Sequence, residues 1–240
     1  MGVPFPIVGP PGAQTARRVT FRQVFQYMSA YLAVPGGVYI NGTGSRDSGN
    51  TGDLDVLRAG LLMGMDTVTG YYQPTILGVS QSAYTSGGTS LTVTAAQAVE
   101  IVRRVGSTGN LRYVGPPTAN GTNAVSGDIA YSAVNTSSGV ITISSIGADK
   151  VAGSFVTDTD GTGLPRTLIP DGAGIKVTDN DGTSVAAVQW PNAPIAGVLL
   201  AEQLLYWPTD TSLQAWIVSS LNAASGGQYI FSDYRYTLYQ

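Results

Sequence analysis

Turn-forming residues interrupt this chain so often that only short secondary-structure elements fit between them. The 240 residues include 31 Gly and 13 Pro. Gly permits tight turns, and Pro interrupts regular helices and central strands. Between residues 111 and 146, Pro116-Pro117, Asn120-Gly121 and Ser137-Ser138-Gly139 separate apolar runs of strand length. The pattern predicts an α+β fold that is mainly β, with short strands joined by tight turns.

Three segments have a helical pattern instead. Thr20-Phe21-Arg22-Gln23, Thr94-Ala95-Ala96-Gln97 and Thr211-Ser212-Leu213-Gln214 all fit the capping box, in which the first and fourth residues bond each other's backbone N–H groups. Apolar residues follow each of them at helical spacing. Helices are therefore expected from residue 20 to before Pro35, over 94–106 and over 211–224. Arg103 and Arg104 suit the negative C-terminal end of the second helix.

The remaining apolar runs predict strands. They cover residues 38–40, 57–64, 70–74, 111–114, 129–134, 140–146, 174–178, 185–190 and 195–200. Asp179-Asn180-Asp181-Gly182 has the composition of a hairpin turn. Residues 41–53 contain four Gly with Ser, Thr, Asn and Asp, which predicts a loop or hinge.

Four parts follow from these patterns. Residues 1–52 form an arm with one amphipathic helix, because four Pro within residues 1–18 favour an extended chain before the helix begins. Residues 53–90 and 157–208 form a β-rich domain. Residues 91–156 form an inserted α+β module, and residues 209–240 supply a helix and a Tyr-rich strand.

Charge is sparse and unevenly distributed. Charged residues make up 11% of the chain, and the formal net charge is −3. Residues 1–46 contain four Arg and no acidic residue, so a basic arm precedes an acidic body. This charge is too small for a general attraction to nucleic acid. Since no apolar run approaches the roughly 18 residues of a membrane span and residues 1–6 lack signal-peptide features, neither a membrane nor a secretory signal is expected.

The absence of His and Cys removes most catalytic chemistry. Thiolate nucleophiles, imidazole bases and the usual zinc, iron–sulfur and haem ligands are excluded. A Ser or Thr nucleophile would need Lys150 or Lys176 as its base, and no G-x-S-x-G or S-x-x-K motif is present. Glu100 and Glu202 are the only Glu residues, and we expect them to be solvated or ion-paired. No catalytic residue and no cofactor is predicted.

Two acidic turns resemble parts of calcium loops. Asp158-Thr159-Asp160-Gly161 and Asp179-Asn180-Asp181-Gly182 alternate carboxylates with a Gly, but neither continues to the bidentate Glu of an EF-hand. Ordinary Asx or hairpin turns are the favoured interpretation, and an oxygen-ligand ion site stays open. No metal-ligand set is predicted, and no Gly-rich phosphate loop is present.

The candidate contact residues lie near the two ends of the chain. Arg17, Arg18 and Arg22 stand beside aromatic residues, an arrangement that suits nucleic acid or an acidic protein surface. A wider basic surface is missing, so a protein partner is favoured. The apolar side of the predicted first helix and the Tyr-rich end complete the predicted contact set, which is Arg17, Arg18, Phe21, Arg22, Val24, Phe25, Met28, Tyr234 and Tyr236.

Two stretches resemble phage head decoration, or capsid cement, proteins. The first runs Leu57-Arg58-Ala59-Gly60-Leu61-Leu62-Met63-Gly64 and continues with Thr69-Gly70-Tyr71-Tyr72-Gln73-Pro74. The second is Pro194-Ile195-Ala196-Gly197-Val198-Leu199-Leu200. The resemblance implies that both stretches belong to one small β-rich, barrel-like or β-tulip-like domain. It also implies a place on the outer capsid surface, commonly as a homotrimer.

The predicted function is therefore structural. The chain is expected to bind the outside of a phage capsid and to stabilise it by bridging neighbouring subunits, with the major capsid protein and copies of itself as partners. The alternative is a receptor- or glycan-binding module of a tail fibre or adhesin. In that case Trp190, Trp207 and Trp216 are the residues to consider for sugar stacking, although all three lie in apolar runs typical of a core.

Overall fold

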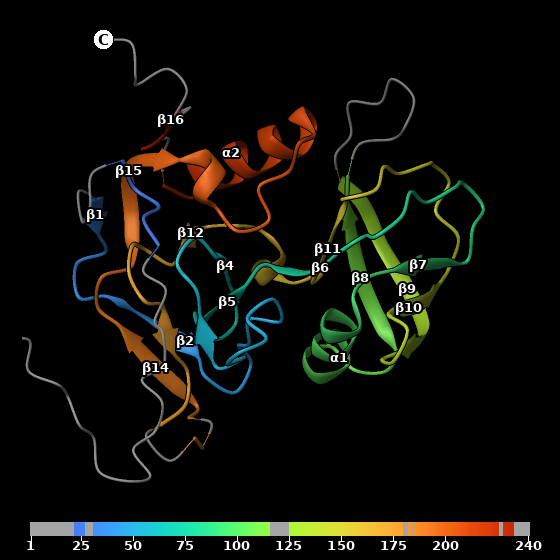
Figure 1. Cartoon of the computed structure of the whole chain (residues 1–240), viewed down its shortest axis with the longest axis horizontal. Helices are drawn as coiled ribbons and strands as arrows, with labels where there is room; N and C mark the ends of the chain where they lie inside the picture. The colour runs from blue at the N-terminus through green and yellow to red at the C-terminus, as the bar shows by residue number, and fades with distance from the viewer. Residues whose placement is uncertain are drawn as a thin grey trace, which may run out of the picture.

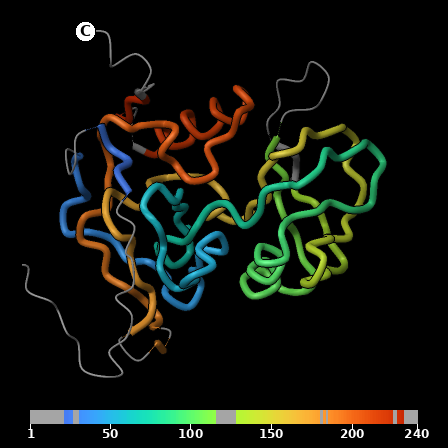
Figure 2. The backbone as a smooth tube through the Cα atoms, viewed as in Figure 1, coloured from blue at the N-terminus to red at the C-terminus, as the bar shows by residue number. Residues whose placement is uncertain are grey.

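The chain folds into two lobes that lie side by side (Figure 1). The computed structural model describes residues 22–26, 31–115, 125–179, 182–183, 185–225 and 228–232. The predicted extended arm, residues 1–18, lies outside this part of the chain. The chain crosses between the lobes after residue 74 and again after residue 157 (Figure 2). The fold is mainly β with two α-helices among the described residues, as predicted, and its sheets are open.

One lobe is a six-stranded antiparallel sheet covered by a helix. The strand order is β6 (Ile76–Val79), β11 (Phe155–Thr157), β8 (Gly109–Val114), β9 (Val125–Asn135), β10 (Val140–Ile143) and β7 (Ser90–Thr92). Helix α1 (Ala95–Arg104) packs against it, and Ala98 and Ile101 enter a core shared with Leu111, Tyr113 and Ile141. The sheet takes in β6 and β7 as well as the predicted 91–156 module, so this unit extends over residues 76–157.

The other lobe contains three smaller sheets. A five-stranded sheet has the order β12 (Thr167–Leu168), β4 (Leu62–Met65), β5 (Tyr72–Pro74), β2 (Val38–Asn41) and β14 (Ala187–Trp190). A three-stranded sheet has the order β1 (Tyr31–Ala33), β15 (Pro194–Leu200) and β16 (Tyr229–Ser232). The third pairs β13 (Ile175–Lys176) with β3 (Val56–Leu57). Two 3₁₀ turns, η1 (Gly161–Gly163) and η2 (Ala201–Gln203), join these elements.

Both downstream helices begin close to their predicted positions. In α1, the Thr94 side chain accepts from the Gln97 N–H and the Gln97 side chain accepts from the Thr94 N–H, which confirms the predicted capping box. Helix α2 (Thr211–Ser225) is capped one residue earlier than predicted. Its cap is Asp210, whose Oδ1 accepts from the N–H groups of Ser212 at 2.9 Å and Leu213 at 3.1 Å. Asp supplies a charged acceptor to the positive helix end, which favours it over the neighbouring Thr.

The helix predicted from residue 20 is wrong. Residues 22–26 are extended, and β1 replaces the end of the predicted helix. Both stretches pair antiparallel with β15: Phe25 lies opposite Leu199, and Leu32 lies opposite Ala196. Tertiary pairing overrides the helical spacing here because β15 needs a backbone partner along this side. Leu32, which the helix would have buried, is 63% exposed in β1.

Close backbone contacts explain why Gly stands in the first motif stretch. A Cβ on Gly64, in β4, would lie 2.1 Å from the Thr162 carbonyl oxygen. Gly60 has a φ of +84°, and its Cβ would lie 2.7 Å from the Gln203 carbonyl oxygen. Gly64 therefore lets η1 approach β4, and Gly60 lets the end of η2 approach the backbone just before β4.

Replacing Gly64 tests this packing. Gly64→Ala should lower the free energy of unfolding by about 1–3 kcal/mol, because the methyl group meets a backbone oxygen that cannot move aside alone. Urea denaturation monitored by Trp fluorescence measures this change. Gly52→Ala is the matched control, since a Cβ there meets no atom within 4 Å. Equal stability of the two variants would contradict the packing argument.

Candidate functional site

Three of the nine predicted contact residues lie within the described part of the chain. Val24 and Phe25 are 0% exposed and belong to a core that also contains Leu199, Trp216 and Ile217. In this fold their side chains offer no surface to a partner, so they anchor the arm to its own body. Arg22 is described below. The other six, Arg17, Arg18, Phe21, Met28, Tyr234 and Tyr236, lie outside the described residues.

The start of the described chain is fixed to the body by hydrogen bonds. Gln26 N–H donates to the Val198 carbonyl, and Leu200 N–H donates to the Val24 carbonyl, both at 2.8 Å. The Asp171 carboxylate accepts the N–H groups of Val24 and Phe25. These contacts hold residues 22–26 beside β15.

Arg22, the first described residue, also contacts the body. Its Nε donates to the Gln203 carbonyl at 2.8 Å, at the end of η2. Partial burial, and then the nearby positive charge of Arg58, lower the pKa of Arg22, although a guanidinium keeps its proton. Arg22 is therefore half-buried and already bonded within the molecule. Only the solvent-facing part of the guanidinium is available for the predicted contact with a partner.

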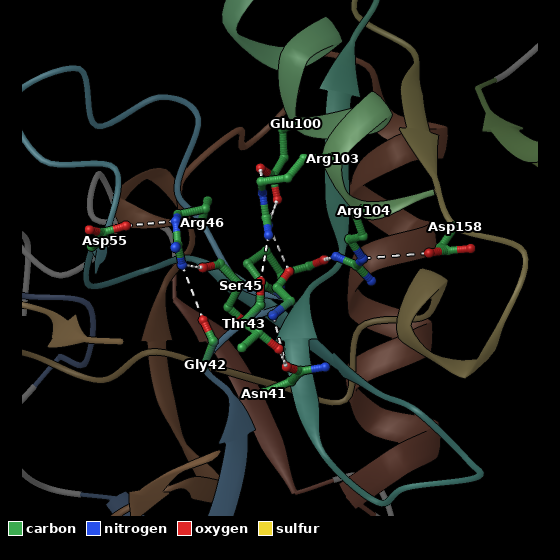
Figure 3. Close-up of polar contacts among 12 residues, drawn as sticks. Asn41, Gly42, Thr43, Ser45, Arg46, Asp55, Glu100, Arg103, Arg104 and Asp158 are labelled. Atoms are coloured by element: carbon green, nitrogen blue, oxygen red, sulfur yellow. Dashed lines mark hydrogen bonds and ion pairs between the residues drawn. The ribbon is translucent and has the colours of Figure 1, made fainter. Parts of the chain in front are cut away.

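A cluster of arginines joins the two lobes (Figure 3). We call Arg103, Arg104 and the loop of residues 41–55 the arginine junction. Arg103, on the last turn of α1, donates to the carbonyls of Thr43 at 2.5 Å and Gly44 at 3.0 Å. Its guanidinium also forms an ion pair with Glu100, one turn earlier. Arg103 therefore stands at the negative C-terminal end of α1, as predicted, and it also contacts the other lobe, which the sequence does not indicate.

Arg104 binds both segments that cross between the lobes. It donates to the Pro74 carbonyl, at the end of β5, and to the Thr162 hydroxyl in η1. Its Nε lies 3.5 Å from Asp158, just after β11, and its side chain is only 4% exposed. Burial lowers the pKa of Arg104, and Asp158 and Asp160 oppose that shift. A buried guanidinium with acceptors on both crossing segments fixes one lobe against the other.

Two further arginines hold the loop of residues 41–55. Arg46 pairs with Asp55 at 2.6 Å and donates to the carbonyls of Gly42 and Ser45. Arg58 makes a two-pronged pair with the buried Asp47, at 2.6 and 2.9 Å. Burial lowers the pKa of Arg58, but Asp47 and Tyr206 together raise it, and the net shift is upward. The segment predicted as a loop or hinge is therefore a loop held in one position.

An aromatic ridge follows η2. It consists of Tyr206, Trp207, Pro208 and Thr209, which lead into the Asp210 cap of α2. Tyr206 has a φ of +61° and is the one non-Gly residue with positive φ in the described ranges. A Cβ on Gly49 would lie 2.6 Å from the Tyr206 hydroxyl, so Gly49 admits this side chain beside Arg58. Burial raises the pKa of Tyr206, the charge of Asp47 raises it further, and Arg58 opposes both.

The ridge separates two grooves. The larger has a volume of about 550 Å³, and the smaller, of about 210 Å³, lies between the ridge and residues 152–155 of the other lobe. Trp207 lines both grooves and stacks on Phe231, with ring centroids 5.9 Å apart. The larger groove is lined by Glu202, Leu204, Tyr206, Trp207, Pro208, Thr209 and Gln214. Of the three Trp residues considered for sugar stacking, Trp190 and Trp216 are 2% and 9% exposed and belong to the core.

The residues weighed for catalysis or ion binding have structural partners. Glu100 pairs with Arg103, and the buried Lys150 donates to the Gly115 carbonyl at 2.7 Å. Asp160 caps η1 through the Thr162 N–H, and Asp179 accepts from the Thr183 N–H at 2.7 Å, which confirms the turn interpretation for both acidic motifs. Within the described ranges, no group of three or more Asp or Glu side chains gathers in a metal-binding arrangement.

The outer strands of the three-stranded sheet expose apolar side chains. Leu32 in β1 and Ile230 in β16 are each 63% exposed. These strands flank β15 on opposite sides, so each presents an unpaired backbone edge within the described sheet. The predicted Tyr-rich strand is present over Tyr229–Ser232.

Comparison with known proteins gives no match to a family model, a curated protein or a solved structure. Neither helix in the described ranges has the length and apolar character needed to cross a bilayer.

The arginine junction predicts a specific stability loss. Arg104→Met should lower the free energy of unfolding by about 1–3 kcal/mol, because it leaves the partly buried Asp158 without its cation and the Pro74 carbonyl without its donor. Urea denaturation measures this change in the free energy of unfolding. Arg112→Met is the control: Arg112 pairs with Asp128, whose side chain is 54% exposed, and a change below about 1 kcal/mol is expected there.

The same variant has a predicted pH dependence. Burial raises the pKa of Asp158, and Arg104 works against that shift, so Arg104→Met raises the folded-state pKa further. A carboxyl group whose pKa is higher in the folded than in the unfolded state destabilises the fold at a pH above its folded-state pKa. This destabilisation is lost as the pH falls from the folded-state pKa to the unfolded-state pKa of about 3.9. The stability gap between wild type and Arg104→Met should therefore narrow on acidification. Arg104→Met with Asp158→Asn should show no such narrowing, and a pH-independent gap in the single variant would contradict this explanation.

Proposed function

We propose that this chain is a non-enzymatic structural protein of a phage virion that binds the outside of the capsid and bridges neighbouring subunits. The observation that carries the proposal is the convergence of the two decoration-like stretches. Although about 120 residues separate them, Ala59 and Leu62 of the first share one core with Leu199 of the second. A single β-rich domain is what the resemblance implies for these segments.

The packing between the two stretches supports the same proposal. The Thr167 hydroxyl, in the strand that pairs with β4, donates to the Pro194 carbonyl at 2.6 Å. Phe25 lies over Gly197, where a Cβ would come within 2.6 Å of its ring. Gly60, Gly64 and Gly197 thus stand at close contacts inside one lobe, so the motif glycines have a common structural role.

The joined lobes suit a protein that bridges subunits. A bridge transmits force only if its parts do not rotate freely, and Arg103 and Arg104 connect α1 to the loop and strands of the other lobe. A preorganised binder also loses less conformational entropy when it attaches. Because such a protein binds assembled capsid and not dissociated subunits, mass action stabilises the shell.

The partners in this proposal are the major capsid protein and further copies of this chain, arranged as a trimer, at the outer surface of the virion. The basic arm supplies charged contacts through Arg17 and Arg18, and the exposed edge at Ile230 supplies an apolar one. No nucleic acid and no membrane takes part.

Removal of the arm tests the charged contact. Deletion of residues 1–18 should weaken attachment to mature, undecorated heads of the encoding phage by at least tenfold, because the arm residues leave while Val24 and Phe25 stay in the core. Co-sedimentation of the variant with heads measures attachment, and thermal unfolding shows that the body is intact. Arg17→Gln with Arg18→Gln should lose part of the binding and most of its salt dependence. Unchanged binding of the deletion variant would overturn the role of the arm.

The exposed edge gives an independent test. Ile230→Lys should weaken head binding while changing the free energy of unfolding by no more than about 0.5 kcal/mol, because the side chain is largely in solvent. Val68→Lys is the matched control. Val68 lies in the turn after β4 and is 91% exposed. Equal binding by the two variants would exclude the β16 edge from the contact.

A further inference from the structure

The larger groove beside the aromatic ridge has the properties of a small-ligand site. Its volume of about 550 Å³ falls within the range of roughly 300–1,000 Å³ that is typical of ligand pockets. Its lining comes from η2, the residues that follow η2 and the first turn of α2. We propose that this groove binds a neutral oligosaccharide, with Trp207 as the stacking platform. This activity does not depend on capsid attachment.

Trp207 has the fixed orientation that stacking requires. Its ring packs nearly parallel to Phe231, at an interplanar angle of 20°, and it lines the grooves on both sides of the ridge. A sugar ring presents C–H groups on its faces and hydroxyl groups around its edge. An aromatic platform suits the faces because it is large, apolar and loses little entropy on binding.

Polar side chains stand where the sugar edge would lie. Glu202, Thr209 and Gln214 line the groove together with Trp207. The Gln214 amide donates to the Pro208 carbonyl at 2.8 Å, which fixes that side chain against the ridge. A carboxylate accepts hydrogen bonds from ligand hydroxyls, and a Thr hydroxyl both donates and accepts. A polyhydroxylated ligand matches this mixture.

The charge of the lining selects against other ligands. No Lys or Arg belongs to the lining among the described residues that form it. The groove therefore offers no cationic side chain to a phosphorylated or sulfated ligand. A compact quaternary ammonium ion needs several aromatic faces around one point, whereas Tyr206 and Trp207 are neighbours along an open groove, which favours a chain of sugar rings.

Backbone strain at Tyr206 is consistent with a binding role. A φ of +61° is unfavourable for a bulky residue, and residues in such conformations cluster at ligand sites. The contacts of Tyr206 with Gly49 and Arg58 hold it in place. This conformation sets the direction of the ridge and therefore the orientation of Trp207 beside it.

Titration of the full chain tests the proposal. The probes are maltotriose, chitotriose and β-1,4-galactotriose, each up to about 10 mM, followed by a glycan array of neutral oligosaccharides, with choline chloride as the cationic comparison. Binding is followed by calorimetry and by Trp fluorescence, which reports on Trp207 because Trp190 and Trp216 are buried. Saturable binding of at least one neutral oligosaccharide is expected.

Variants assign the binding to the groove. Trp207→Ala and Glu202→Gln should each weaken it by about tenfold, and Trp207→Phe, which retains a ring against Phe231, serves if the Ala variant does not fold. Tyr39→Ala removes an aromatic side chain that is 50% exposed elsewhere and should bind as wild type does. The proposal is overturned if no neutral saccharide binds, if choline alone binds, or if Trp207→Phe and Glu202→Gln both leave the affinity unchanged.

Discussion

The contact between the two lobes combines the buried guanidinium of Arg104 with apolar packing, in which Phe155 of the six-stranded sheet lies against Trp216 of α2. The chain passes between the lobes twice, and Arg104 contacts the end of the first crossing at Pro74 and the second at Asp158 and Thr162. Such a charge is stable inside a protein only where its hydrogen bonds and counter-charge are complete. The geometry of both crossings is therefore coupled to one side chain, and Arg103 extends the contact to the loop after β2.

Within the larger lobe, β15 organises the distant parts of the chain. Residues 22–26 and β1 pair along one side of it, and β16 pairs along the other. The N-terminal segment and the C-terminal strand thus meet on one strand of the second decoration-like stretch. This arrangement connects the proposed function to the fold, because residues 22–26, which follow the basic arm in the sequence, and the exposed edge at Ile230 lie along the same strand, β15.

Local sequence signals predicted much of this structure. The turn chemistry gave the mainly β class, and the Thr94 and Gln97 pair gave the start of α1, since both depend on residues close together in sequence. The prediction of an N-terminal helix was wrong because Val24 and Phe25 have helical spacing, but this segment pairs with β15, which is far away in the sequence. The Asp210 cap was missed for a smaller reason, because Thr211 offered a complete T-x-x-Q match one residue later.

The candidate site was less predictable. Arg103 and Arg104 had a sufficient local explanation in the helix dipole, and no local pattern indicates that they reach Thr43 or Pro74 in another lobe. Trp207 follows an apolar run and packs against the core as expected, but its partial exposure beside the groove follows the turn at Tyr206 and has no signal in the sequence. Long-range contacts of this kind have no signature in a single sequence.

The central claim is that this protein strengthens a capsid by bridging its subunits. The most direct measurement is the rupture temperature of mature, undecorated heads as the full chain is titrated in, with bound copies counted per capsomer. The account predicts that the rupture temperature rises with occupancy and levels off at a fixed copy number. A head population that takes up no protein, or that takes it up and ruptures at an unchanged temperature, would contradict it.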